Sequence, residues 1–350
     1  MFYRTLGKTN ILLSAIGFGG GVFNLNKDLS MTLERAKEAA KLAVYNGINF
    51  IDMGKEYDEE FVSKVIEDVR DKVHIITRSE SKDSYEMKRD INDSIKKLRV
   101  TPLVYEIMVN SLEDFKTMIN NGVTDSLREA KSNGKIKFIG IFSHKTEVLE
   151  EAIKTNEFDV IMTLYNAVHR KAEEIFPLKK KYKFGFIAAS PFATGILVDP
   201  KYDKNINIPG ADYMSAENAL KFVLSSKYVD ATVIGMKTPS HIQENIKFAD
   251  KKIFLTEDDR RKIAETMENF LGKDFCRMCR YCEGCLGVSI ADLLRFLTIG
   301  RTYGYLDFVK WQYASFKDKI FNKNFVECEK LCPYSLPISN LLEQLNNMVR

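Results

Sequence analysis

The stretch LERAKEAAKLAVYNGINFID, residues 33–52, decides the fold class. Its first part carries apolar residues at helical spacing from Leu33 to Ala43. Gly47 then stands where a helix commonly ends. The apolar run 48–52 that follows is typical of a buried strand. A helix that leads directly into a buried strand is the building unit of an α/β protein.

The same alternation recurs along the body of the chain, with about eight strands in all. Eight is the number expected of a parallel (β/α)8 TIM barrel with an outer ring of helices. A doubly wound open sheet is the structural alternative, but no GxGxxG sequence stands at a strand-to-helix turn. We expect strands at 15–19, 48–52, 73–77, 104–109, 136–142, 160–164, 184–189 and 231–235. Helices are expected near 33–44, 87–98, 111–133, 145–156, 169–182, 214–227 and 239–249.

Composition excludes several classes of protein. The chain has 350 residues, of which 45% are hydrophobic and 29% charged, as in an ordinary globular protein. Its net charge of +4 is too small to suggest a nucleic-acid or membrane-surface partner. The N-terminus does not resemble a secretory signal, and no apolar run of about 18 residues suggests a membrane span. We therefore expect a cytoplasmic protein.

All six cysteines lie between Cys276 and Cys332. This distribution predicts two domains, a cysteine-free body (1–271) and a cysteine-rich tail (272–350). In the cytoplasm such a cluster is more typical of a metal site than of disulfides. The spacings are C-x2-C-x2-C-x2-C followed by C-x3-C-P, which suit an iron–sulfur cluster or a structural zinc ion.

Polar side chains stand at or just after the ends of three expected strands: Asp52, Arg78 and Asn110. Tyr57 follows Asp52 by five residues. Active sites of parallel barrels lie at the carboxyl ends of the strands, so these four groups are candidates for one site. The alternative is structural, with Asp52 as a helix cap, Arg78 as a solvated loop cation and Tyr57 as rim packing.

Several motifs together resemble the aldo-keto reductase family. They are YRTLGKT (3–9) with SAIGFG (14–19), GINFID (47–52) before Tyr57, GKIKFIG (134–140) before Ser143, and IGMK (234–237) before Glu244 and Asn245. The resemblance spans roughly residues 2–270. It implies the eight-stranded barrel and NADPH-dependent reduction of a carbonyl compound, or the reverse oxidation.

The family's catalytic set is Asp, Tyr, Lys and His, and this chain keeps half of it. The resemblance assigns Tyr57 as the proton donor and Asp52 as its electrostatic partner. Arg78 stands in place of the lysine and Asn110 in place of the histidine. Arginine keeps the positive charge but is not interchangeable with lysine, and asparagine can orient a carbonyl but cannot shuttle a proton.

The resemblance also implies an NADP(H) site. Ser143 matches a family position that holds the nicotinamide carboxamide, whereas His144, Met162 and Ala189 depart from its partners. Phe192 can supply an aromatic ring nearby, and Lys237 and Ser240 can contact a 2′-phosphate. The alternative for Lys237 is a solvated loop cation, and for Glu244 and Asn245 an exposed helix face. The cofactor-binding residues implied are Gly19, Ser143, Ser190, Phe192, Gly235, Lys237, Ser240, Glu244 and Asn245.

The tail resembles the ferredoxin-like C-terminal domain of one branch of the family, although two cysteines of the usual second group are missing. By the crossover pattern of ferredoxins, Cys276, Cys279, Cys282 and Cys332 hold one 4Fe–4S cluster. Cys285 and Cys328 are then leftovers that lie near each other. A second assignment uses the four consecutive cysteines from Cys276 to Cys285, and zinc is a third.

Three functions remain open at this stage. The leading one is an oxidoreductase of aldo-keto reductase type, which acts on a small carbonyl or alcohol and carries an accessory 4Fe–4S cluster. The second is an iron–sulfur electron-transfer protein or redox partner whose barrel has lost hydride transfer. The third is a ligand-binding barrel stabilised by zinc. A redox protein is a further candidate partner for the first two.

Overall fold

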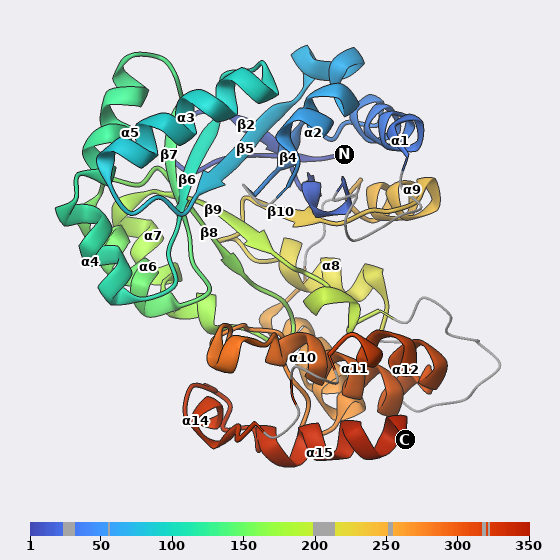
Figure 1. Ribbon diagram of the computed structural model, residues 1–350. Helices are drawn as coiled ribbons and strands as arrows, with labels where there is room; N and C mark the ends of the chain where they lie inside the picture. Colours follow the sequence, from blue (N-terminus) through green and yellow to red (C-terminus); the bar gives the residue numbers. More distant parts are fainter. Residues whose placement is uncertain (24–31, 55–56, 199–213, 251–254, 317–319, 321–322) are drawn as a thin grey trace. The chain divides into compact units, whose positions relative to one another are not determined.

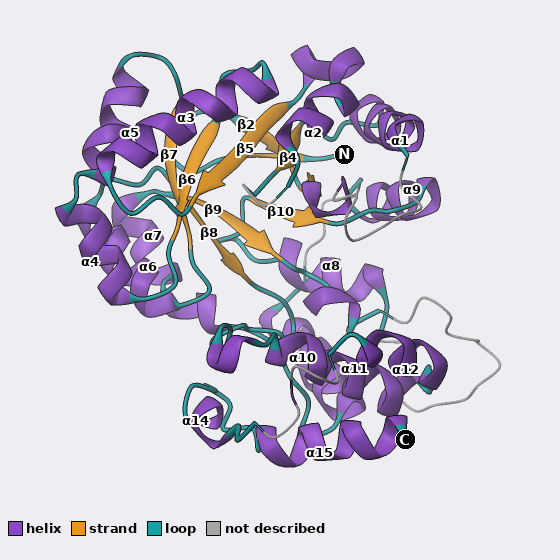
Figure 2. Cartoon of the chain, viewed as in Figure 1, coloured by secondary structure: helices purple, strands orange, loops and turns teal. Residues whose placement is uncertain are grey.

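The computed structural model describes residues 1–23, 32–54, 57–198, 214–250, 255–316, 320 and 323–350. It contains a closed parallel barrel of eight strands in the order β10-β3-β4-β5-β6-β7-β8-β9. Each predicted strand is present, so the expected barrel is confirmed and the open-sheet alternative is wrong (Figure 2). The strands are β3 (Ile16–Gly19), β4 (Phe50–Asp52), β5 (His74–Ser79), β6 (Val104–Met108), β7 (Phe138–Phe142), β8 (Val160–Leu164), β9 (Gly185–Ala189) and β10 (Ala231–Ile234).

Helices surround these strands (Figure 1). Around the ring α1 packs on α9 and α2, α2 packs on α3, and α3 packs on α5. The barrel helices are α1 (Leu33–Tyr45), α2 (Glu59–Val65), α3 (Ser84–Leu98), α4 (Leu112–Asn120), α5 (Val123–Ser132), α6 (Thr146–Thr155), α7 (Phe176–Tyr182) and α9 (Pro239–Phe248). The helix α8 (Ala216–Leu224) precedes the last strand in sequence.

Local sequence explains where these helices begin and which face they bury. The Thr32 side chain caps α1 by accepting a hydrogen bond from the backbone N–H of Arg35, and Asp83 caps α3 in the same way. Buried positions recur every three to four residues along α3, as the apolar spacing predicts. Its buried residues are Met87, Asp90, Ile91, Ser94 and Leu98.

Two predicted helices differ from the structure. The expected helix over 111–133 is divided into α4 and α5, because Gly122 adopts a left-handed conformation with φ of 76°. The expected helix over 169–182 is shorter, with a 3-10 turn at Lys171–Glu174 followed by α7. The spacing of apolar residues gives no sign of either interruption.

A short hairpin that the sequence analysis did not predict precedes the barrel. It pairs β1 (Tyr3–Thr5) antiparallel with β2 (Leu12–Ser14). Leu6 and Leu13 from this hairpin are fully buried in the same apolar cluster as Phe50 and Val160 of the barrel strands. The hairpin therefore completes the apolar core of the barrel.

The chain divides into two compact units. The first holds residues 1–165, 171–191 and 223–254, and the second holds 166–170, 192–222 and 255–350. The second unit is mainly helical, and α11 packs on α12 and α15. Its described helices from residue 255 onward are α10 (Glu257–Leu271), α11 (Ile290–Tyr303), α12 (Leu306–Ala314), α14 (Val326–Glu329) and α15 (Ile338–Val349).

The domain boundary predicted between residues 271 and 272 remains a prediction. No helix in the described part of the chain combines the length and the apolar character needed to cross a bilayer.

Candidate active site

Asp52 and Arg78 form an ion pair at the carboxyl end of the barrel strands, called the barrel mouth below. Asp52 is the last residue of β4, and Arg78 is the penultimate residue of β5. The Nη2 of Arg78 donates a hydrogen bond to Oδ1 of Asp52, and both residues are buried. Two neighbouring parallel strands thus bring the predicted acid and cation together, and the interpretation of Arg78 as a solvated cation is wrong.

A third charged residue, Glu106 on β6, joins this pair and was not predicted. Its Oε2 accepts a hydrogen bond of 3.0 Å from Nε of Arg78, and its side chain is fully buried. Burial is the main cause that raises the pKa of Glu106 to about 7, with Arg78 acting in the opposite direction and Asp52 adding to the rise. The sequence signal was a lone acid inside a strand that is otherwise apolar.

The guanidinium of Arg78 also touches two apolar side chains of the barrel. The central carbon of the guanidinium, Cζ, lies 4.6 Å from the ring centroid of Phe142 on β7. This distance is typical of a cation–π contact. Its Nη2 lies 3.4 Å from the sulfur of Met162 on β8. Arg78 therefore has defined contacts on its edges and on its face.

Tyr57 and Asn110 follow strands that end at the barrel mouth. Tyr57 lies in the segment after β4 and packs against Gly20 and Gly21, which follow β3. A Cβ atom at Gly21 would lie 3.0 Å from the phenol oxygen of Tyr57, so a glycine keeps the space around that oxygen open. Asn110 is exposed two residues after the end of β6. All four predicted catalytic residues thus belong to the mouth end of the barrel.

Ser143 follows β7 and is buried. Its hydroxyl accepts a hydrogen bond of 3.1 Å from the backbone N–H of Lys145, and its carbonyl accepts one of 2.6 Å from Thr163. Ser190 follows β9 with a left-handed φ of 58°. Phe192, expected beside this region, belongs to the second compact unit.

The expected phosphate-binding segment follows β10. Gly19 and Gly235 approach closely, since a Cβ at Gly19 would lie 3.3 Å from the Gly235 nitrogen. Lys237 is exposed, and Thr238 then caps α9 by accepting a hydrogen bond of 3.2 Å from His241 N–H. The side chains of Ser240 and Glu244 are exposed on the first turns of this helix.

Asn245 does not lie on an exposed helix face, so the structural alternative given for it above is wrong. It is buried on α9. Among the described residues its Oδ1 has no hydrogen-bond partner. A buried carbonyl oxygen without a partner is uncommon in proteins and is often satisfied by a bound molecule.

Four cysteines line one small pocket in the second unit: Cys276, Cys279, Cys282 and Cys332. The first three are buried thiols. Burial raises the pKa of Cys279 to about 11 and that of Cys282 to about 12. The remaining wall is formed by Arg277, Arg280, Leu294, Pro333, Tyr334, Leu336 and Ile338.

The backbone around this pocket is unusual. Backbone N–H groups of Met278 and Tyr281 donate to the sulfurs of Cys276 and Cys279. Met278 and Arg280 adopt left-handed conformations with φ of 58° and 60°. Such conformations are costly for residues other than glycine and tend to occur at functional sites.

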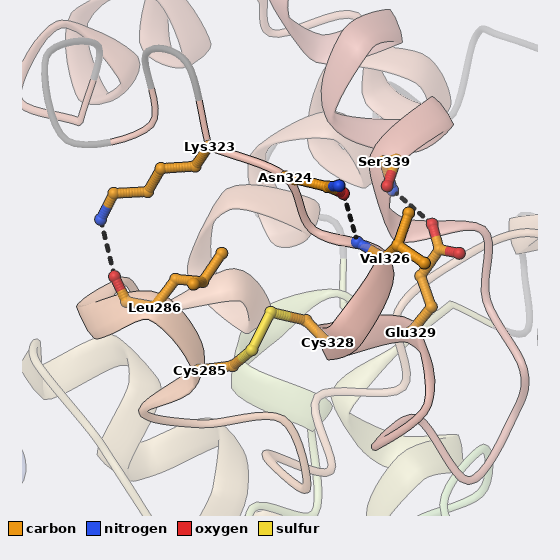
Figure 3. The surroundings of a disulfide bond; sticks show 8 residues. All are labelled: Cys285, Leu286, Lys323, Asn324, Val326, Cys328, Glu329 and Ser339. Carbon is orange, nitrogen blue, oxygen red and sulfur yellow. Dashed lines mark hydrogen bonds between the residues drawn. A yellow bond between two sulfur atoms is a disulfide. The ribbon is translucent and has the colours of Figure 1, made fainter.

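The other two cysteines form a disulfide between Cys285 and Cys328, which are 43 residues apart in sequence (Figure 3). The expectation that these two lie near each other is confirmed, whereas the preference for metal ligands over disulfides is wrong for this pair. The bond joins the segment that carries three pocket cysteines to the segment that carries Cys332. Lys323 strengthens the link by donating a hydrogen bond of 2.6 Å to the carbonyl of Leu286.

The metal predicted from the cysteine spacing has no direct confirmation in the geometry. Within the described parts of the chain, no group of three or more histidine, cysteine, aspartate or glutamate side chains is arranged around a single ion position. The four pocket cysteines therefore share a lining without converging on one point.

The fold and the site define a class of protein: a (β/α)8 barrel whose mouth holds a buried acid–guanidinium pair, with a tyrosine in the segment after the strand that carries the acid, the layout of a barrel enzyme. The model of the family described as "Aldo/keto reductase family" matches residues 15–213, more than half of the chain. The chain therefore belongs to the aldo/keto reductase family of oxidoreductases.

Individual relatives are distant. An uncharacterized oxidoreductase of Bacillus subtilis, YqkF, is 23% identical over 300 residues, which cover 74% of this chain and 94% of that protein. L-galactose dehydrogenase of Arabidopsis thaliana is 24% identical over 285 residues, covering 69% and 86%. The aldo-keto reductase AKR11C1 from Bacillus halodurans (holo form) matches in structure with a TM-score of 0.65 at 21% identity, covering 76% and 96%. These matches support the barrel and leave roughly a quarter of this chain uncovered.

Proposed function

We propose that the protein is an NADP(H)-dependent oxidoreductase that reduces a small carbonyl compound or catalyses the reverse oxidation. The observation that carries this proposal is the buried Asp52–Arg78 pair at the barrel mouth, with Tyr57 following the same strand as Asp52. An acid, a fixed cation and a phenol are the groups that proton transfer to a carbonyl oxygen requires.

The residues at the phosphate end fit NADP(H). Lys237 offers a cation and the first turn of α9 offers backbone N–H groups, a combination that suits phosphate. Gly19 allows the segment after β10 to approach the end of β3 closely, which brings Gly235 to the same end of the barrel. The unpartnered Oδ1 of Asn245 adds a buried acceptor on the same helix. When bound, NADP(H) supplies or accepts the hydride.

The protein's own residues manage the proton. In the direction of reduction, the phenol of Tyr57 gives its proton to the carbonyl oxygen as the carbon receives hydride. An unperturbed tyrosine has a pKa near 10, so a nearby cation is needed to stabilise its deprotonated form. Arg78 provides that positive charge, and Asp52 holds it in place. Asn110 orients the carbonyl through its amide N–H.

We further propose that Cys276, Cys279, Cys282 and Cys332 hold a 4Fe–4S cluster, which would supply one-electron chemistry. Their shared pocket and the N–H donors to two sulfurs support this assignment. A cluster is larger than a single ion, so its thiolates need not converge on one point as zinc ligands do. The disulfide engages Cys285, which favours this set over the four consecutive cysteines.

Titration of the protein with NADPH, followed by nucleotide fluorescence, tests the hydride cofactor. We expect saturable binding that Lys237→Ala weakens about tenfold, because one charge-assisted contact to phosphate is lost. Lys247→Ala, in the last turn of the same helix, is the matched control and should bind as the wild type does. Absence of NADPH binding would contradict the proposal.

Metal analysis of protein purified without oxygen tests the cluster. We expect about four iron and about four acid-labile sulfide per chain, with a broad visible absorption band. Zinc without sulfide would instead select the structural zinc site. Iron and sulfide together with NADPH binding, but no NADPH oxidation with any carbonyl, would favour the electron-transfer alternative.

A further inference from the structure

Glu106 is a buried acid inside the barrel, and its direction follows from the alternation of side chains along β6. The neighbouring Tyr105 places its hydroxyl 3.5 Å from Ser94 of α3, on the outer side of the strand. Side chains alternate along a strand, so Glu106 faces the interior. Pairing across the sheet sets Arg78 and Gly140 on either side of Glu106 at the same level.

The neighbouring strand leaves room for this acid. A Cβ atom at Gly140 would lie 2.7 Å from Cγ of Glu106, closer than two carbon atoms can pack. The glutamate side chain therefore occupies the space that a larger residue at 140 would fill. The position of the acid is accommodated by the barrel and is not a chance orientation of a surface group.

Glu106 contacts Nε of Arg78, an atom that a lysine lacks. Glu106 accepts a hydrogen bond from Nε, whereas Asp52 accepts one from Nη2. The two carboxylates therefore bind different nitrogens of the guanidinium. Lysine carries a single nitrogen and cannot present two separated edges in this way. The arginine at the family's lysine position and the acid on the next strand are thus geometrically matched.

We propose that Glu106 is a positioning residue of the hydride-transfer site, which anchors the Nε edge of Arg78 so that a guanidinium serves where the family uses an ammonium. This inference rests on the proposed function. It assigns Glu106 no contact with substrate, and its effect reaches the reaction through Arg78. One carboxylate oxygen, Oε2, makes the anchor, while Oε1 is buried and without a partner among the described residues.

Ionisation of Glu106 should also make the rate of reduction depend on pH. The charged groups that act on Glu106 are Asp52 of β4 and Arg78 of β5, whereas β7 and β8 present the uncharged Phe142 and Met162. Protonated Glu106 leaves the three-residue cluster neutral, and ionised Glu106 makes it negative. Negative charge below the mouth disfavours negative charge on the substrate oxygen. Reduction should therefore slow as pH rises through about 7.

Single-turnover NADPH oxidation with a carbonyl substrate, measured from pH 5.5 to 8.5, tests this role. We expect Glu106→Gln, which retains an acceptor for Nε, to keep the rate at low pH and to abolish the decline. Glu106→Leu should lower the rate about tenfold or more at every pH, because Arg78 loses an anchor. Glu59→Gln is the matched control, since Glu59 is another buried acid but hydrogen-bonds Thr77 instead of Arg78.

A double-mutant cycle tests the match between the two residues. We expect Arg78→Lys alone to be more impaired than Arg78→Lys combined with Glu106→Leu, because the lysine then pairs with Asp52 without a second buried acid beside it. Additive effects of the two substitutions, or a wild-type pH profile in Glu106→Leu, would overturn the proposal. Circular dichroism of each variant is the control that checks whether the variant is folded.

A readout without turnover separates this inference from the proposed function. The infrared carbonyl band of a protonated carboxyl group should titrate near pH 7 in the wild type and be missing in Glu106→Gln. In Arg78→Met the band should persist to higher pH by about one unit or more, because the guanidinium no longer favours the ionised form. An unchanged titration in Arg78→Met would overturn the anchor even in an active enzyme. A shifted titration in a protein without NADPH turnover would retain the anchor and reject the hydride function.

Discussion

The barrel mouth and the cysteine pocket both bury reactive groups, but they stabilise them in different ways. At the mouth, the guanidinium of Arg78 pairs with two acids, Asp52 and Glu106. In the pocket, thiols lie against a partly apolar wall, and burial raises the pKa of Cys279 to about 11. In the first site a cation of the chain itself pairs with both acids. We propose that the second is completed by a bound group, which requires the thiols to lose their protons.

Removal of one pocket cysteine should have the largest effect. We expect Cys332→Ser to lower iron and sulfide to background and to remove the visible absorption band, because a cluster of this type requires its four thiolates. Iron and sulfide quantitation on anaerobically purified protein measures the change. The disulfide cysteines provide the control, since the double variant Cys285→Ser/Cys328→Ser should retain most of its iron. Retention of full iron content by Cys332→Ser would remove Cys332 from the ligand set.

Loss of the disulfide should affect stability more than metal content. The bond closes a loop of 43 residues, and chain-entropy arguments give a contribution of about 2–4 kcal/mol for loops of this size. We expect Cys285→Ser/Cys328→Ser to lower the free energy of unfolding by that amount in urea titrations. A midpoint equal to that of the wild type under oxidising conditions would show that the bond does not stabilise the second unit.

The charge cluster of the barrel should make stability depend on pH. The pKa of Glu106 in the folded protein, about 7, lies above its ordinary value of 4.5. The folded state therefore binds more protons between these values, and stability falls as pH rises through that window. Relative to Glu106→Gln, the wild type should lose about 2–3 kcal/mol between pH 5 and about 7. Parallel pH curves for the two proteins, measured by urea unfolding, would contradict this prediction.

Asn110 should give the smallest effect. Its side chain is exposed after β6 and is proposed to contribute one neutral hydrogen bond to the carbonyl. Such a bond is worth about 0.5–1.5 kcal/mol, so Asn110→Ala should lower kcat/KM by about tenfold or less. Asn110→His tests the family's own residue at this position. A loss of several orders of magnitude in Asn110→Ala would show that the amide does more than orient the substrate.

The strands and most helices were predictable because burial imposes periodicity on the sequence. The break at Gly122 was missed, since one left-handed residue does not disturb apolar spacing on either side. The hairpin β1–β2 was missed because strands of three residues carry too short a pattern. The elements that position the site were therefore predictable, and the errors lie at connections.

The candidate site was predictable only in part. Asp52 and Arg78 were found from the ends of their strands, and their contact follows from the parallel register. Glu106 was missed because it stands within its strand and not at the end, where the barrel rule directs attention. The pairing of Cys285 with Cys328 was foreseen as proximity, but the argument from a reducing compartment led away from a disulfide.

The most direct test of the account is NADPH oxidation over a panel of small carbonyl compounds, measured for the wild type and for Tyr57→Phe. The central claim is that this barrel transfers hydride although arginine and asparagine replace two of the family's catalytic residues. We predict turnover in the wild type and a loss of about 10²–10⁴-fold in Tyr57→Phe with NADPH binding unchanged. Tyr85→Phe, at an exposed tyrosine, should behave as the wild type does. Equal turnover in Tyr57→Phe and the wild type would contradict the claim.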